Sequence, residues 1–344
     1  MTPPQQKNFH TANPETESAI DRSIPEFEAA KTSDEDAYFR NHTPPSYLPE
    51  IAKEVQDFIQ YHLDTTGKRI ALVTSGGTTV PLENNTVRFI DNFSAGTRGA
   101  TSAEYFLENG YAVIFLHREF SLLPYSRHYS HSTNCFLDFM IEKDNKIEIN
   151  SKFADEMLVV LRKYNDAKDS NSLLLLPFTT VNQYLYTLKT ISENLRIMKS
   201  KALFYLAAAV SDFFIPQSRM PQHKIQSSAT NDGELVIRLA QVPKFLSRLV
   251  DNWAQGAMII SFKLETDNNI LIKKASSALE RYHHQLVIGN LLQTRKKEVV
   301  FVSPDEKEQW IKLSDEEITD KVEIESKMIP AVIKVHDAWI SKNT

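Results

Sequence analysis

The stretch that decides the fold is RIALVTSGGTTVPLENNTVRFIDNFSAGTRGATSAEYFLENG, residues 69–110. It opens with a short apolar run, residues 70–73, which predicts a strand buried on both faces. The run ends in the small residues 74–79, whose backbone amides a ligand can approach closely, above all at Gly76 and Gly77. We interpret this strand and turn as one half of a phosphate cradle.

The other half of the cradle is a predicted helix start. Gly96 and Gly99 open a segment in which residues 100, 103, 106 and 107 are apolar, which is helical spacing. Gly110 follows where a C-cap glycine belongs. A helix N-terminus favours phosphates, but both glycine pairs are also ordinary turn sequences. The chain has no GxGxxG with a ribose-binding acid downstream and no GxxxxGK[ST], which argues against a dinucleotide fingerprint and a P-loop.

The composition excludes several classes of protein. The chain has 344 residues, which could form one large or two modest domains, and its hydrophobic fraction of 42% is ordinary for a globular protein. Its charged fraction of 24% and net charge of −5 do not suggest that it binds a polyanion. No basic block or RNP-type motif occurs, so we expect no nucleic acid. Cys135 is the only cysteine, which excludes an intramolecular disulfide and a CxxC metal site. We see no secretory segment and no apolar run near ~18 residues, and therefore expect no membrane span and a cytoplasmic protein.

Two segments of different character divide the chain. Residues 1–45 are rich in Pro, Thr, Ser, Asn, Asp and Glu, and predict a flexible tail with one short acidic helix around residues 15–31. We expect residues 46–344 to form a single domain.

Helices and strands alternate through that domain. We expect strands at 70–74, 111–116, 172–177, 203–210, 258–262, 286–288, 297–302 and 310–312. We expect helices at 46–66, near 136–140, at 151–165, 180–196, 243–253 and 268–282, and one long helix over 315–340 that Pro330 breaks or kinks. An extended hairpin is expected from 224–227 and 234–239 across a turn at 231–233, and Gly289-Asn290 is read as a turn.

This alternation predicts an α/β fold: a Rossmann-like, mainly parallel sheet with helices on both faces, plus a small C-terminal antiparallel extension. In such sheets ligands bind beyond the carboxyl ends of the strands. Those ends carry residues 75–77, 209–212, 262–265 and 289–290.

Each polar candidate also has a plain structural interpretation. Asp212 can be a solvated strand-end acid, Lys224 and Arg88 surface cations, Asn92 and Asn290 turn residues, and Phe262 a core residue. The histidine pairs His128/His131 and His283/His284 lack a converging third ligand, so we expect no metal-ligating residues. The absence of a Gly-x-Ser-x-Gly elbow argues against a hydrolase triad.

Several separated motifs match one family together. SGGTTVPLE, VRFIDNFSAGTRGATSAEYFLENGY, YLAAAVSDF, KIQSS, VPK, ISFKLETD and a late Gly-Asn occur in the order and spacing of eukaryotic phosphopantothenate–cysteine ligase. The chain resembles this family over roughly residues 46–340, and only weakly over 118–170.

The resemblance implies a ligase of coenzyme A biosynthesis. Its co-substrate would be ATP, or CTP as in bacterial relatives, with Mg²⁺; it would activate the 4′-phosphopantothenate carboxylate to an acyl-nucleotide, which then forms an amide with L-cysteine. By the same resemblance, the residues that hold the nucleotide are Gly76, Ser94, Gly96, Gly99, Phe262 and Asn290. Those that hold phosphopantothenate are Asn92, Ala208, Ala209, Asp212 and, from the neighbouring subunit of a homodimer with a shared site, Arg88. Asn92, Asp212 and Lys224 would be catalytic, Lys224 acting on the acyl-nucleotide.

Two other classes of function compete with the ligase. An inert binding or scaffold protein on the same fold would be expected to lose some of Asn92, Asp212, Lys224 and Asn290, and all four are present. An NAD-dependent dehydrogenase is suggested by the fold class alone, and the missing fingerprint argues against it.

Overall fold

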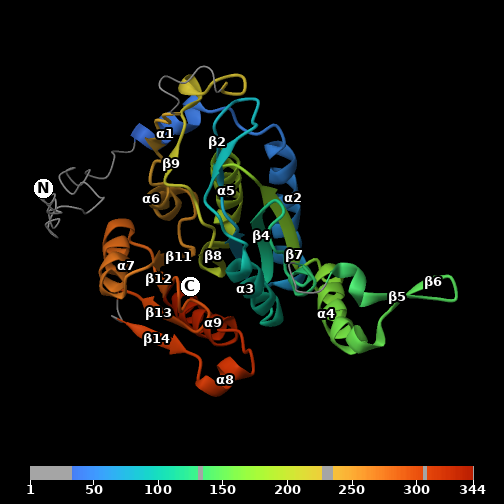
Figure 1. Ribbon diagram of the computed structural model, residues 1–344. Helices are drawn as coiled ribbons and strands as arrows, with labels where there is room; N and C mark the ends of the chain where they lie inside the picture. The colour runs from blue at the N-terminus through green and yellow to red at the C-terminus, as the bar shows by residue number, and fades with distance from the viewer. Residues whose placement is uncertain (1–32, 131–134, 227–234, 305–307, 344) are drawn as a thin grey trace, which may run out of the picture.

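The structure is a computed structural model that describes residues 33–130, 135–226, 235–304 and 308–343 (Figure 1). Its strands are β1 (Ile70–Ser75), β2 (Thr79–Pro81), β3 (Phe89–Asp91), β4 (Ala112–Arg118), β5 (Met140–Lys143), β6 (Lys146–Ile149), β7 (Leu173–Phe178), β8 (Ala202–Leu206), β9 (Phe213–Phe214), β10 (Ala240–Gln241), β11 (Met258–Glu265), β12 (Leu286–Leu291), β13 (Glu298–Val302) and β14 (Gln309–Lys312). Its α-helices are α1 (Ser33–Asn41), α2 (Leu48–Tyr61), α3 (Thr97–Glu108), α4 (Ser151–Asp169), α5 (Val181–Leu195), α6 (Leu246–Arg248), α7 (Asn268–Tyr282), α8 (Asp315–Thr319) and α9 (Glu325–Asn343).

Eight of these strands form one sheet in the order β14-β13-β12-β11-β8-β1-β4-β7. The strands from β12 to β7 pair in parallel, with β1 central between β8 and β4. β13 and β14 add the antiparallel extension at the other edge. The predicted fold class is therefore confirmed.

Helices cover both faces of this sheet because the central strands are apolar on both sides. In β1, Ile70 and Leu72 pack with α2 and α5, whereas Ala71 and Val73 pack with α3 and α9. All four side chains are fully buried. α7 covers β12 and β13 through a further apolar cluster.

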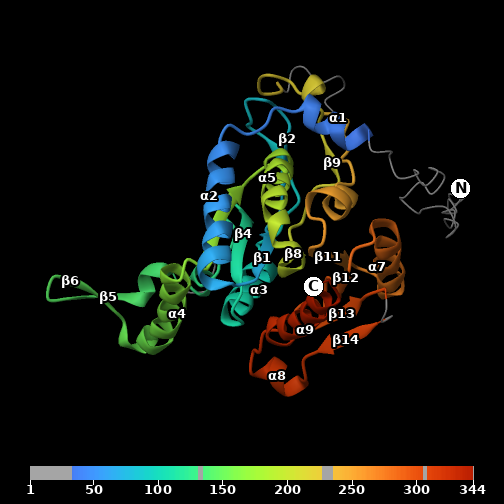
Figure 2. The ribbon, with the colours of Figure 1, turned by 180° about the vertical axis from the view of Figure 1, so that it is seen from behind.

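The segment between β4 and β7 departs from the parallel pattern. The helix expected near 136–140 is one 3₁₀ turn, Phe136–Phe139, and the antiparallel hairpin β5–β6 follows it. Figures 1 and 2 show this hairpin projecting away from the rest of the protein, beyond α4. The hairpin was not predicted from the sequence because its turn residues, Asp144 and Asn145, are not glycines, although both adopt positive φ angles.

The described part of the N-terminal segment, from residue 33 onward, is folded against the rest of the protein. Helix α1 packs on the body, with Tyr38 buried in the same core as Phe245 and Phe214. Arg248 fixes it further through ion pairs with Glu35, at 2.8 Å, and Asp36, at 2.7 Å. The tail predicted for 1–45 therefore does not extend over residues 33–45. The helix expected at 15–31 lies outside the described residues.

Three further expectations need correction. β8 ends at Leu206 rather than 210, because the chain turns away to meet the segment after β1. The extended hairpin expected at 224–239 is not formed by its described residues; instead β10 pairs with β9. Its turn at 231–233 lies outside the described residues. The helix expected at 243–253 begins later, at α6, and continues as the π-type turn Leu249–Trp253.

The expected long C-terminal helix is two helices. α8 ends at Thr319, where Lys321 adopts a φ of +57° and the Val322 N–H bonds back to Glu317. Pro330 lies inside α9 without breaking it. Among the helices that the structure describes, none combines the length and the apolar character needed to cross a membrane.

Candidate functional site

The chain segments that follow β1 and β8 are joined at the carboxyl edge of the sheet. The N–H of Ala209 donates to the oxygen of Gly76 at 2.8 Å, and the oxygen of Ala209 accepts from the N–H of Thr78 at 3.0 Å. Ser211 continues the contact, donating from its N–H to the Thr78 hydroxyl at 2.9 Å. Two predicted site segments, 74–79 and 208–212, are thus held side by side by their own backbones.

Ser75 brings the second glycine cluster to the same edge. Its hydroxyl donates to the oxygen of Gly96 at 3.0 Å. A Cβ atom on Gly99 would lie 2.5 Å from the Ser75 Cβ, so only glycine lets α3 start this close to the end of β1. Gly96, the N-cap of α3, has a φ of +84°, which also favours glycine. The first N–H groups of a helix have no partner within it, so α3 presents donors at this edge.

Asn92 lies between the two glycine turns, as predicted. Its N–H donates to the oxygen of Thr78 at 3.1 Å. The Ser94 hydroxyl accepts from the N–H of Gly96 at 3.3 Å, which shapes the turn before α3. Arg118 and Asp91 brace the same loop with an ion pair at 2.5 Å. The structure therefore brings Gly76, Asn92, Ser94, Gly96 and Gly99 together.

A cavity of about 230 Å³ adjoins this edge, and two of the predicted substrate residues line it. Ala208 and Asp212 line it, and the N–H of Ala208 is fixed by the Thr74 hydroxyl at 3.1 Å. Asp212 is exposed, and its carboxylate pairs with the Lys244 ammonium at 3.1 Å. Lys244 also lines the cavity, and sequence reasoning gave it no role, although its VPK motif was among the matched segments.

Phe262 and Asn290 come from neighbouring parallel strands. The Phe262 ring is half-buried, and its centroid lies 4.9 Å from that of Tyr205. Asn290 of β12 is only 7% exposed and pairs with Leu264 of β11. The expectation that Gly289-Asn290 forms a turn is therefore wrong: β12 stays in parallel register with β11 as far as Leu291.

Close packing, and not a turn, explains why position 289 is a glycine. A Cβ atom there would lie 2.9 Å from a Val300 methyl group and 3.2 Å from one of Leu271. The strand needs glycine where α7 and β13 press on it.

Arg88 and Lys224 lie on two segments that contact each other, the loop between β2 and β3 and residues 221–226. Arg88 donates from Nη2 to the oxygen of Ile225 at 3.0 Å, so its guanidinium is engaged within its own chain. Lys224 is exposed, and its segment is fixed by contacts to residues 83–88. Sequence reasoning gave no role to Glu83, a fully buried carboxylate in this cluster, because nothing in the motif PLE distinguishes a buried acid from an exposed one.

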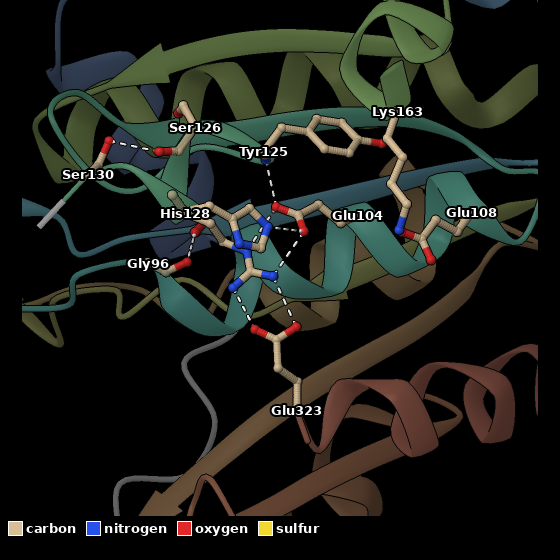
Figure 3. Close-up of polar contacts among 11 residues, drawn as sticks. Gly96, Glu104, Glu108, Tyr125, Ser126, His128, Ser130, Lys163 and Glu323 are labelled. Atoms are coloured by element: carbon tan, nitrogen blue, oxygen red, sulfur yellow. Dashed lines mark hydrogen bonds and ion pairs between the residues drawn. The ribbon is translucent and has the colours of Figure 1, made fainter. Parts of the chain in front are cut away.

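A separate ionic cluster fixes the loop that follows β4, residues 119–130 (Figure 3). Arg127 reaches Glu104 of α3 at 2.8 Å and Glu323 at 2.6 Å, and His128 adds a contact to Glu104 at 3.2 Å. Burial opposes ionisation of Glu104, but His128, Arg127 and the N–H of Tyr125 hold the pKa of its carboxyl below its usual range. The loop fixed in this way carries Ser121, whose side chain lies against Gly76 and Gly96. We assign the cluster a structural role.

Within the described ranges, no group of three or more His, Cys, Asp or Glu side chains is arranged to hold a metal ion.

Comparisons with known proteins place the chain among proteins of one kind. Residues 186–333 match the family described as the DNA/pantothenate metabolism flavoprotein C-terminal domain. The chain is 52% identical to the Saccharomyces cerevisiae protein named phosphopantothenate–cysteine ligase CAB2, over 97% of this chain and 94% of that protein. It is 44% identical to the human phosphopantothenate–cysteine ligase, over 83% of this chain and 92% of the human one. A solved structure of a Cab2 mutant in complex with phosphopantothenate-cysteine superposes with a TM-score of 0.84, at 55% identity over 90% of this chain and 99% of that one.

Proposed function

This chain belongs to the phosphopantothenate–cysteine ligase family, and we propose that it joins 4′-phosphopantothenate to L-cysteine in two nucleotide-dependent steps. It is an enzyme of the ligase class. One observation carries the proposal: the turns at Gly76 and Gly96 meet the Ala209 segment at the same sheet edge, next to the cavity lined by Ala208 and Asp212.

In the first step, an oxygen of the phosphopantothenate carboxylate attacks the α-phosphorus of the nucleotide, and pyrophosphate leaves. Both reactants are anionic, so the site must offset their repulsion. Backbone N–H groups at the glycine turns and the N-terminus of α3 can do this without reorganising. Phe262 and Asn290 would face the nucleoside, ATP in the first instance, and we propose that Mg²⁺ enters with the triphosphate, neutralising part of its charge.

Phosphopantothenate would occupy the cavity beside these turns. The small side chains of Ala208 and Ala209 let a ligand approach the backbone closely, and Asp212 can accept a hydrogen bond from a pantothenate hydroxyl or amide. Asn92 lies between the two turns and can contact the carboxylate where it reacts. Holding both reactants at one edge lowers the entropic cost of their encounter.

In the second step, the cysteine amine attacks the acyl carbon, the C–N bond forms, and the nucleoside monophosphate leaves as the C–O bond breaks. The tetrahedral intermediate carries an oxyanion that the acyl-nucleotide lacks. A cation that meets it there lowers the barrier selectively. We assign this role to Lys224.

We further propose a homodimer in which Arg88 reaches the phosphate of a substrate bound to the neighbouring subunit. The position of Arg88 supports this proposal. It lies on the same hairpin as Phe89 and Ile90, two apolar residues that are 51% and 40% exposed and that a second subunit could cover. A guanidinium binds phosphate in a bidentate manner, which suits the role.

The test of the function is a pyrophosphate-release assay with phosphopantothenate, cysteine and either ATP or CTP. We expect release that depends on phosphopantothenate, and an amide product that depends also on cysteine. Absence of both with either nucleotide would leave only the inert binding protein.

A second experiment tests the role of Lys224. Lys224→Gln keeps a donor of similar length but removes the charge, so the acyl-nucleotide should form and then accumulate in the presence of cysteine. Rapid quenching followed by mass spectrometry measures this. If pyrophosphate release slows equally and no acyl-nucleotide is found, Lys224 acts in the first step instead.

A further inference from the structure

Glu83 is a carboxylate with no exposed surface in the loop that joins β2 to β3. Its Oε2 accepts from the N–H of Arg88 at 3.1 Å and from that of Val87 at 3.4 Å. Its Oε1 accepts from the N–H of Ile225 at 3.4 Å and lies 3.5 Å from Nη1 of Arg88. All these partners are donors, and only a carboxylate can accept on both of its oxygens.

Arg88 completes a clamp around Ile225. Its Nη2 donates to the main-chain oxygen of Ile225 at 3.0 Å, while Glu83 accepts from the N–H of that residue. Both main-chain polar groups of Ile225 are therefore satisfied by one acid–base pair that lies more than a hundred positions earlier in the sequence. Lys224 directly precedes the clamped residue.

The contact extends along the arm that leads to Lys224. The N–H of Asn84 donates to the oxygen of Pro221 at 2.9 Å, and the N–H of Asn85 donates to that of Gln222 at 3.1 Å. The Asn84 amide also donates to the Gln222 side chain at 3.1 Å. Residues 221–225 thus lie along residues 84–88 in one register, and Glu83 is the buried anchor of that register.

The electrostatics favour the charged form of Glu83. Burial opposes ionisation of Glu83, but the N–H groups of Arg88, Ile225 and Val87, with the Arg88 guanidinium, hold the pKa of its carboxyl below its usual range. A buried carboxylate that serves only to fill space would be replaceable by an apolar side chain. This one fixes two segments that each carry a candidate site cation.

We propose that Glu83 is a positioning residue of the ligase: by clamping Ile225 together with Arg88, it sets where the Lys224 ammonium enters the active site. This rests on the role proposed above for Lys224. The same clamp relates the two cations to each other. A guanidinium has five N–H donors, so Arg88 can hold Ile225 and still bind a phosphate, and both cations then keep a fixed spacing.

The first test needs no activity. Trypsin cleaves after Lys224, at the bond whose N–H Glu83 accepts from. In Glu83→Gln, an NH2 group replaces one carboxylate oxygen. This NH2 group is itself a donor, so it cannot accept the N–H bonds that the oxygen accepted. We expect the fragment ending at Lys224 to appear roughly tenfold faster by mass spectrometry, since a hydrogen bond to a charged group is lost. Glu104→Gln is the matched control, because it removes a buried carboxylate whose partners are residues 125–128 and not the arm, so it should leave this cleavage rate unchanged.

The second test asks whether Glu83 acts through Lys224. Glu83→Gln should make the acyl-nucleotide accumulate on cysteine addition, as expected for Lys224→Gln, and the double variant should react no more slowly than Lys224→Gln alone. A role in folding alone would lower the melting temperature without changing the balance between the two steps, which is the result expected of Glu104→Gln.

The outcomes separate the two proposals. An unchanged cleavage rate in Glu83→Gln, or additive losses in the double variant of an active enzyme, would overturn the positioning role. If the wild-type protein releases no pyrophosphate while Glu83→Gln is still cleaved faster than the wild type, the clamp exists but the proposed function is wrong. Any role of the clamp in catalysis would then be overturned as well.

Discussion

Gly77 lies directly against the backbone of Asn92: a Cβ atom built on Gly77 would be 1.8 Å from the Asn92 main-chain oxygen. Backbone faces backbone there, so no side-chain movement can relieve the clash. The first glycine turn and the loop before α3 are therefore fitted to each other.

We expect Gly77→Ala to abolish activity and to lower the unfolding free energy by more than about 2 kcal/mol, since it forces the Asn92 loop away. Urea unfolding and the pyrophosphate assay measure this. Gly110→Ala is the control: its φ is +80°, but nothing lies within 4 Å of the added Cβ, so only a backbone strain of about 1–2 kcal/mol is expected and activity is retained. Equal effects of the two variants would contradict the close-contact argument.

Asn92→Ala should abolish product formation while the protein stays folded, because Asn92 is partly exposed between the glycine turns and its backbone bond to Thr78 does not need its side chain. Turnover and the circular dichroism spectrum are the measurements. Asn109→Ala, at the far end of α3, removes an amide of the same type and should leave turnover intact. Near-normal turnover in Asn92→Ala would remove Asn92 from the site.

A shared active site predicts complementation between inactive subunits. Arg88→Ala and Asn92→Ala subunits are each expected to be inactive as homodimers, but a mixed dimer would contain one site with both native residues. Activity should therefore reappear after subunit exchange, verified by native mass spectrometry. Exchange without recovery of activity would argue that Arg88 serves its own subunit.

Lys244 should contribute to substrate binding, because it lines the cavity with Asp212 and the substrate is anionic. The exposed ion pair itself is worth little to stability. We expect Lys244→Met to raise the KM for phosphopantothenate roughly tenfold, as for one lost charged hydrogen bond, with the melting temperature and the nucleotide KM unchanged. Lys143→Met on the projecting β5–β6 hairpin is the charge-matched control. A change in the nucleotide KM alone would place Lys244 elsewhere in the reaction.

Stability should fall in mild acid because several histidines are buried, and burial lowers the pKa most for His284 and His336. Burial is the main cause that lowers the pKa of His336 to about 4, and the same cause lowers that of His284 to about 4. In the unfolded chain a histidine titrates near 6.5. The unfolded state therefore binds more protons between these values, so the stabilisation is complete above about pH 6.5 and is lost as the pH falls toward 4.

The measurement is urea unfolding at pH 7 and pH 5, where each such histidine should cost about 2 kcal/mol. In its neutral form, the His336 ring donates from Nε2 to the oxygen of Ser200 at 2.8 Å, and its Nδ1 lies 2.7 Å from the Tyr111 hydroxyl as an acceptor. His336→Gln should be less stable at pH 7 but show a smaller loss on going to pH 5. An undiminished loss would assign the pH dependence to other groups.

Local sequence was enough to predict those features whose geometry depends only on neighbouring residues. The run 70–73 predicted a doubly buried strand, and Ile70 and Val73 are both fully buried on opposite sides. Gly96 and Gly110 marked the two ends of α3, and both have positive φ angles. The matched motifs gave the family and most of the glycine-rich edge, since each motif is a continuous segment whose backbone geometry follows from its own residues.

Contacts between distant segments could not be predicted in this way. Asn290 was expected in a turn, but pairing with Leu264 of the neighbouring strand keeps it in β12. Glu83 and Lys244 lie in matched motifs, but neither motif indicates a role for them, because each is positioned by a partner remote in sequence, Ile225 and Asp212 respectively. The sequence by itself determined the alternation of elements, the sheet and the family; the tertiary structure decided which cation faces which acid, because burial and ion pairing depend on how whole elements pack rather than on the order of neighbouring residues.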